Sequence, residues 1–180
     1  MLMKTRFFAP GETGFSLIEV MVSLIIIAIG LLGVAKMQAQ AIGNVKVSSS
    51  RSISAIHAAS MASAMHANKA FWAAGLAPSS VQVTGVMLSD AVLNGQTTNC
   101  VTSACTPVQL AGFDLQTWGS ALVQQLPGGN GTVSCSTAVG AVISCSVTVN
   151  WSEKYIGINQ TTLNSANQTA TQSLNLLVQP

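Results

Sequence analysis

The sequence predicts an α+β chain: a long N-terminal helix, half membrane-spanning and half amphipathic, packed on a small antiparallel β-sheet domain. No proline occurs between Pro10 and Pro78, so one helix can run from Phe15 to Ala74. Beyond Pro78, short alternating stretches separated by glycine and asparagine are typical of strands. We expect four parts: a leader at 1–14, an apolar helix at 15–37, its amphipathic continuation at 38–75 and a globular domain at 76–180.

An apolar run from Phe15 to Ala35 contains one charged residue, Glu19. Its length, about 21 residues, is enough to cross a bilayer as a helix at ~1.5 Å per residue. A carboxylate at membrane depth costs on the order of 2.5–3.5 kcal/mol, and less near a helix end. Glu19 is therefore a functional candidate that needs a partner.

Two simpler interpretations of this region stay open. One is a secretory signal peptide cleaved at the A-x-A sequence of residues 39–41, although the apolar run exceeds the usual length of about 7–15 residues. The other is a plain membrane anchor in which Glu19 reaches the headgroups. Orientation is not settled by charge, because basic residues flank the run on both sides: Lys4, Arg6, Lys36, Lys46 and Arg51.

Composition favours an exported chain with one domain. Charged residues make up 7% of the chain, against about 25% in an average soluble protein. The polar surface is supplied instead by serine, threonine, asparagine and glutamine. The net charge of +2 and the lack of a basic run with interleaved aromatics argue against a nucleic-acid partner.

The four cysteines allow three disulfide connectivities. We favour Cys100–Cys105 and Cys135–Cys145, because alternating stretches around the second pair would place its members opposite each other across a hairpin. The alternative is a zinc site, since the spacing of Cys100 and Cys105 is tolerable for ligands; the second pair does not resemble a zinc knuckle. Disulfides imply an oxidising compartment, here the periplasm or cell surface.

The helix is predicted to continue past the membrane with one apolar stripe and to stop at Gly75 and Pro78. His57 and His66 are nine residues apart, which at ~100° per residue places them on opposite faces. They cannot share a metal, and we expect no metal site. The stripe expected to face the domain is Ile42, Val45, Ser49, Ile53, Ile56, Ser60, Ala67 and Phe71.

In the globular part, Val81–Leu88 is predicted as a first strand and Asn94–Gly95 as a turn. Asp114 resembles the N-cap of a helix at 115–126 that stops at Pro127. We interpret Glu153 as a turn residue without a partner. The remaining elements are a hairpin of strands 132–136 and 142–150 turning at 139–140, a polar loop at 164–171 and a last strand at 171–178.

The polar segment that ends in Gly14, directly before the apolar run, resembles the type III signal sequence of type IV prepilins and type II secretion pseudopilins. The resemblance implies that a prepilin peptidase cuts after Gly14 and methylates the new N-terminal residue, Phe15. Glu19 would then be the fifth mature residue. In that family the fifth-position glutamate is thought to meet the N-terminal amine of a neighbouring subunit, which would pair the buried charge.

The opening GFSLIEVMVSLIIIAIGLLGVAKMQ also resembles the PilV family of type IV pilus minor pilins, as do three later segments: 114–118, 126–133 and 147–151. Residues 76–113 carry no family feature. The resemblance implies a pilin-like fold and a set of partners: other minor pilins, the major pilin, the prepilin peptidase and the inner membrane. A tip adhesin is a further candidate partner.

No catalytic constellation is visible, because the sequence lacks a G-x-S-x-G elbow, a Cys–His pair and a P-loop. We expect no cofactor and no enzymatic activity. The expected function is that of a minor pilin that promotes initiation of pilus assembly in a tip complex, with adhesion as a further role. It would sit first in the inner membrane, with its C-terminal domain periplasmic, and then in the pilus. A type II secretion pseudopilin is the nearest alternative. A membrane-anchored adhesin or ligand-binding module that does not polymerise is an alternative of another class, and a periplasmic enzyme is more distant.

Overall fold

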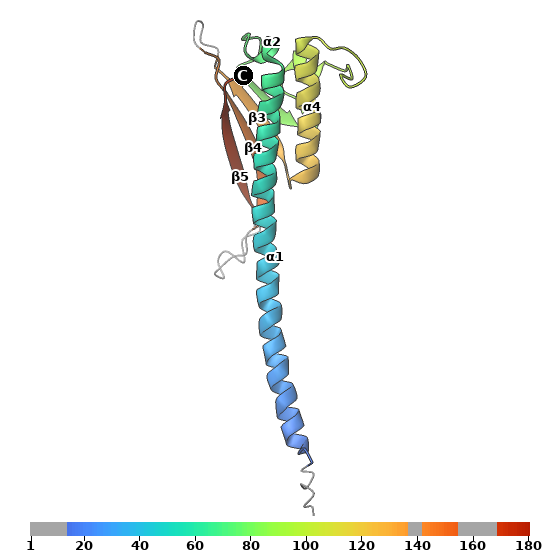
Figure 1. Cartoon of the computed structure of the whole chain (residues 1–180), viewed down its shortest axis with the longest axis vertical. Coiled ribbons are helices and arrows are strands. Elements are labelled where there is room, and N and C mark those ends of the chain that lie inside the picture. The colour runs from blue at the N-terminus through green and yellow to red at the C-terminus, as the bar shows by residue number, and fades with distance from the viewer. Residues whose placement is uncertain (1–13, 137–141, 155–168) are drawn as a thin grey trace, which may run out of the picture. The chain divides into compact units, whose positions relative to one another are not determined.

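The computed structural model describes residues 14–136, 142–154 and 169–180. The chain divides into two compact units, residues 1–45 and 46–180. Helix α1, Leu17–Ala67, runs through both. The architecture is the predicted α+β arrangement, a long N-terminal helix packed on a small antiparallel sheet of five strands (Figure 1).

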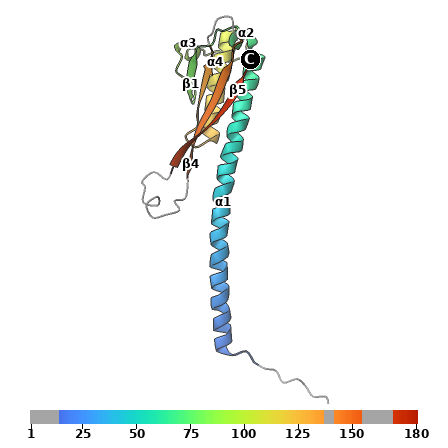
Figure 2. The same cartoon turned by 90° about the vertical axis from the view of Figure 1, so that its left-hand side faces the viewer.

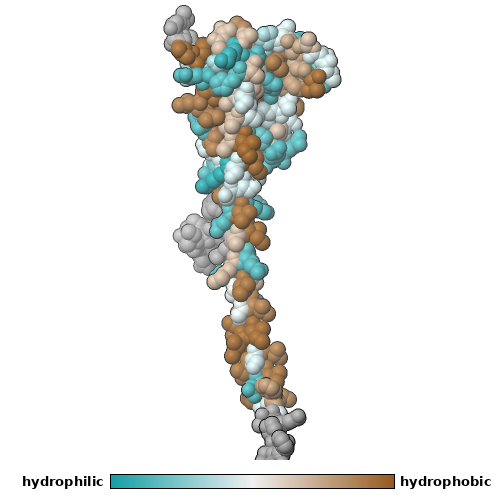
Figure 3. All heavy atoms as spheres, in the orientation of Figure 1, coloured by the Kyte–Doolittle hydropathy of each residue, from teal (hydrophilic) through white to brown (hydrophobic). Residues whose placement is uncertain are grey.

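In the first unit, α1 begins after Ser16, whose carbonyl oxygen accepts the amides of Glu19 and Val20. Exposed apolar side chains occur on all sides of this part of the helix. Figure 3 shows them in brown on the face in view. By length and composition, α1 is a candidate membrane span. An apolar helix that is exposed all round is stable in lipid or against other helices.

In the second unit, α1 ends earlier than predicted. Asn68 has non-helical dihedrals (φ −113°, ψ 53°), and the short helix α2, Lys69–Trp72, follows. The cause is a tertiary contact, because the buried Asn68 amide donates to the carbonyl oxygen of Pro107 at 2.7 Å. Gly75 then turns the chain with a positive φ of 72°. The predicted single helix to Ala74 is therefore wrong in two respects: it is interrupted at Asn68, and its second part ends at Trp72.

The five strands form one antiparallel sheet in the order β2-β1-β3-β4-β5 (Figures 1 and 2). The predicted single strand Val81–Leu88 is wrong. Instead, β1, Ser80–Thr84, and β2, Met87–Leu88, form a hairpin around Gly85, whose φ is 59°. Only a residue that tolerates a positive φ makes this turn easily.

The central hairpin agrees with the prediction in its pairing, although its second strand begins three residues later and ends four residues later than predicted. Strands β3, Asn130–Cys135, and β4, Cys145–Lys154, pair so that Cys135 lies opposite Cys145. Strand β5, Thr169–Val178, begins two residues before its predicted start. The turn predicted at 139–140 lies outside the described residues, as does most of the polar loop predicted at 164–171.

Helix α4, Pro107–Gln125, is longer than predicted, and Asp114 is not its cap. The N-cap is Thr106, which forms a capping box with Gln109, and Pro107 takes the first helical position. Asp114 therefore lies in the middle of the helix. A shorter helix, α3, Ala91–Asn94, precedes it and is capped by the side chain of Asp90.

Helix α4 and residues 46–67 of α1 cover the same face of the sheet, because both contribute side chains to one core with its inward valines. The Trp118 indole, which donates to the carbonyl oxygen of His57 at 2.9 Å, links the two helices. Gly131 of β3 leaves room for the Trp118 ring. The core includes Ala58, Met61, Met65, Leu115, Trp118, Leu122, Val81, Val83, Val133, Val147, Val149 and Trp151.

The face of α1 that packs on the domain differs from the predicted stripe. Ile53 is half-buried and Phe71 is buried, as expected, but Ile56 is 66% exposed. The buried positions include Ser54 and Ala58. Ser54 tolerates burial because its hydroxyl donates to the carbonyl oxygen of Arg51. The choice of positions by apolarity alone therefore predicted the wrong face of α1 as the one that packs on the domain.

Candidate functional site

The predicted processing point lies in non-helical chain directly before α1. Gly14, Phe15 and Ser16 are exposed and precede the first helical residue. Around Gly14, a β-carbon would meet no described atom within 4 Å. The peptide bond between Gly14 and Phe15 therefore lies outside the helix and between exposed residues. The rest of the leader, residues 1–13, lies outside the described structure.

Glu19 lies in the first turn of α1 and is exposed. A carboxylate is favoured there by the unpaired amides at the helix N-terminus. Ser23 bonds to the backbone carbonyl oxygen of Glu19 at 2.7 Å and leaves its carboxylate free. Within the described residues, the one ion pair joins Arg51 and Glu153. The Glu19 carboxylate thus has no intramolecular cation in this part of the chain.

The four cysteines form the two disulfides that the sequence favoured. Cys100–Cys105 closes a loop that ends next to Thr106, the cap of α4. Cys135–Cys145 joins β3 to β4 between directly opposed residues, with a Cα–Cα distance of 4.0 Å. No cysteine is free, so the geometry leaves no thiolate for the alternative zinc site.

The two histidines of α1 lie apart, as their spacing predicts. His57 is buried, and its Nε2 is 3.3 Å from Oε1 of Gln125. His66 is exposed near the end of the helix. Among the described residues, no group of three His, Cys, Asp or Glu side chains could hold a metal ion.

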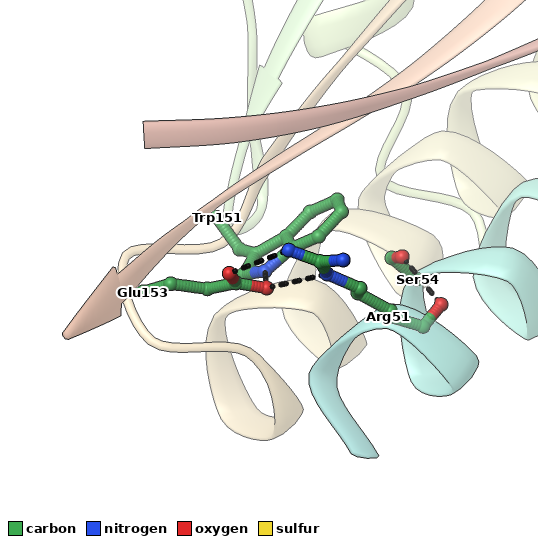
Figure 4. Close-up of polar contacts among 4 residues, drawn as sticks. All are labelled: Arg51, Ser54, Trp151 and Glu153. Carbon is green, nitrogen blue, oxygen red and sulfur yellow. Dashed lines mark hydrogen bonds and ion pairs between the residues drawn. The ribbon is translucent and has the colours of Figure 1, made fainter. Parts of the chain in front are cut away.

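An ion pair between Arg51 of α1 and Glu153 of β4 joins the helix to the sheet (Figure 4). The guanidinium of Arg51 donates to both carboxylate oxygens of Glu153, at 3.3 and 3.2 Å, and the Trp151 indole adds a third bond at 2.9 Å. The Glu153 side chain is only 9% exposed, whereas that of Arg51 is 60% exposed. The interpretation of Glu153 as an unpartnered turn residue is wrong. No sequence signal indicated a partner 102 positions away.

The ion pair shifts the pKa values of both residues. The hydrogen bond from Arg51 holds the pKa of the Glu153 carboxyl below its ordinary value, with a smaller contribution from Trp151. The same hydrogen bond raises the pKa of Arg51. Bidentate pairing of this kind orients both groups. We read the contact as a clamp that fixes α1 on the sheet.

Asp114 faces a groove between α1 and α4. The groove measures about 170 Å³ and is lined by residues of both helices, including Ser60, Met61, Phe113 and Thr117. Burial raises the pKa of Asp114 to about 6, and no hydrogen bond or charge offsets it. The prediction of Asp114 as an N-cap is therefore wrong. The Thr106–Gln109 capping box, visible in the sequence, was the signal that would have placed it mid-helix.

With this geometry described, comparison with known proteins gives one family match. Residues 10–35 match the prokaryotic N-terminal methylation motif. The match contains Gly14, Phe15 and Glu19 and supports a type IV pilin-like or pseudopilin protein with a structural role. It is consistent with anchoring in a membrane through the apolar part of α1. No curated protein and no solved structure matches the chain.

Proposed function

We propose that the protein is a minor pilin of the type IV pilus, similar to the PilV family, which promotes initiation of pilus assembly within a minor-pilin tip complex. The observation that carries the proposal is the methylation motif at residues 10–35, which covers Gly14, Phe15 and the first part of an exposed apolar helix with one carboxylate. A prepilin peptidase would cut after Gly14 and methylate Phe15. The chain would stay in the inner membrane, with residues 46–180 in the periplasm, until it enters the pilus.

The choice of a minor pilin rests on the three later segments that resemble PilV. They belong to α4, to the connection from α4 into β3, and to β4. The segments pack on one another, because the Trp118 ring lies at Gly131 and Val133 pairs with Val147. The resemblance therefore covers one continuous part of the core, which supports a shared domain as well as a shared leader.

Assembly would proceed by non-covalent packing with other minor pilins and the major pilin. In a bilayer the Glu19 carboxylate is unfavourable, whereas the methylated amine of a neighbouring Phe15 can offset its cost. Opposite charges about 4 Å apart attract by roughly 4 kcal/mol at an effective dielectric constant of about 20. The interaction would stabilise the assembly and leave the fold of residues 46–180 unchanged.

The test compares Glu19→Gln and Glu19→Ala with the wild type in the native host. We expect both variants to insert and to be cleaved normally, but to show a ratio of sheared-filament to inner-membrane protein lowered roughly tenfold or more, as a loss of at least ~1.4 kcal/mol would give. Ser23→Ala, one turn along the helix, is the matched control and should keep the wild-type ratio. An unchanged ratio in both Glu19 variants would remove the role proposed for this carboxylate.

A type II secretion pseudopilin remains the second candidate, because the methylation motif fits it equally well. Deletion of the gene separates the two. Loss of surface pili with normal secretion of folded exoproteins supports the minor pilin, and the opposite result supports the pseudopilin. A chain that never leaves the inner membrane, with both processes intact, would favour an anchored binding module.

A further inference from the structure

Asp114 is the carboxylate of residues 46–180 that the described structure leaves without a partner. This unit has three carboxylates in its described residues. The side chain of Asp90 accepts the amide of Leu93 as a helix cap, and Glu153 pairs with Arg51. Asp114 has neither kind of contact and is about half-buried. A neutral side chain would occupy the same place without the cost of desolvating a charge.

The groove around Asp114 has the features that suit a long basic side chain. Met61 and Ala64 of α1 and Phe113 of α4 provide apolar walls for an aliphatic stem. The Phe113 ring also suits a cation near its face. Ser60 and Thr117 are also lining residues, and hydroxyl oxygens can accept hydrogen bonds from an ammonium or guanidinium group.

The groove does not suit a metal ion, because its lining contains one carboxylate and no histidine. Neither His57 nor His66 is part of it. Phe113 and Thr117 also line a second, larger hollow along α4 with Gln116, Ser120 and Gln124, and the residues that line this hollow are uncharged. The surface is therefore polar and neutral, with a single negative charge in a recess.

We propose that this groove between α1 and α4 receives a lysine or arginine side chain of a neighbouring subunit, whose charge pairs with Asp114. The argument for this occupant is charge complementarity. A recessed carboxylate without an internal partner is satisfied by a cation from outside, and a stem that fills the groove excludes water from the pair. The inference rests on the proposed function, because it assumes that the protein assembles with other subunits.

The first experiment measures incorporation of Asp114→Asn as the ratio of sheared-filament to inner-membrane protein. We expect a decrease of about fivefold or more with normal cleavage and normal folding of residues 46–180, since asparagine has the same shape without the charge. Asp114→Glu should recover part of the wild-type ratio. The control is Gln124→Ala, an exposed change on the same helix, which should keep it. Equal ratios for Asp114→Asn and wild type would overturn the groove assignment and leave the assembly role intact.

The second experiment places a photo-crosslinking residue at Thr117, which is exposed and lines the groove. With the full-length protein in its native membranes, we expect a crosslink to another subunit at a position near a Lys or Arg residue of that subunit. Asp114→Asn should abolish this crosslink. The same probe at Thr171 on β5 is the control for random contact. A crosslink that survives Asp114→Asn, or none at all, contradicts the inference. If the wild-type chain is absent from filaments, the assembly role fails and this crosslink alone decides the groove.

Discussion

Replacement of Asp114 by asparagine is expected to stabilise the folded protein at neutral pH. Burial raises the pKa of this carboxyl to about 6 from its ordinary value of 3.8. The folded chain therefore holds the proton more tightly than the unfolded chain does. Stability from this group is fully present below about pH 4, falls as the pH rises, and is lost above about pH 6. Asparagine has no proton to lose, so its contribution does not change with pH.

The magnitude follows from the shift of about two pH units. At about 1.36 kcal/mol per unit of pKa, the whole shift would correspond to roughly 3 kcal/mol before solvent screening is considered. About half of that, ~1.5 kcal/mol, is expected, because the carboxyl is only about half-buried and water screens its charge. For a chain of this size, a change of ~1.5 kcal/mol raises the melting temperature by roughly 3–6 °C.

The assay is denaturant unfolding of the purified full chain, with disulfides intact, at several pH values between 4 and 8. Only the difference between Asp114→Asn and wild type is informative, because Glu153, with its lowered pKa, loses stability in the opposite direction as the pH falls. We expect a difference near zero at pH 4 that grows to ~1.5 kcal/mol at pH 7. Gln124→Ala should show no such growth. A pH-independent difference, or a less stable variant at pH 7, would refute the reasoning.

Two further predictions concern packing and crosslinks. Gly119→Ala should destabilise residues 46–180 by about 1–3 kcal/mol in thermal unfolding, because its β-carbon would overlap the carbonyl oxygen of Gly85. Gly43→Ala is the control: a β-carbon meets no described atom there, and alanine favours a helix by up to about 1 kcal/mol, so it should not destabilise the chain. An equal loss of stability in both variants would contradict the packing described. Replacement of both Cys135 and Cys145 by serine should lower the free energy of unfolding by about 3 kcal/mol, and replacement of both Cys100 and Cys105 by about 2 kcal/mol. The difference follows from the lengths of the loops that the two disulfides close. The reverse order in denaturant unfolding would count against the structural role assigned to the β3–β4 crosslink.

Local signals in the sequence predicted the parts of the fold that depend on local chemistry. The apolar run after Gly14 indicated the first part of α1, and the alternation around Cys135 and Cys145 indicated both the hairpin and its disulfide. The capping box at Thr106 was equally local, and the start of α4 could have been predicted from it.

Features set by contacts distant in the chain could not be predicted in this way. Asn68 interrupts the helix because its side-chain amide donates a hydrogen bond to the backbone carbonyl oxygen of Pro107, 39 positions away. The register of α1 on the domain depends on a buried serine and on Arg51, whose partner is 102 positions away. The groove at Asp114 forms only when α1 and α4 lie side by side. None of these pairings leaves a pattern in either segment alone.

The most direct test of the central claim is the intact mass of the mature protein purified from the filament fraction. The account predicts a chain that starts at Phe15, carries one additional methyl group at its N-terminus and contains two disulfides. A chain that still begins at Met1, or one that begins after Ala41 as a secretory signal peptide would leave it, would contradict the claim that this is a processed, assembling pilin.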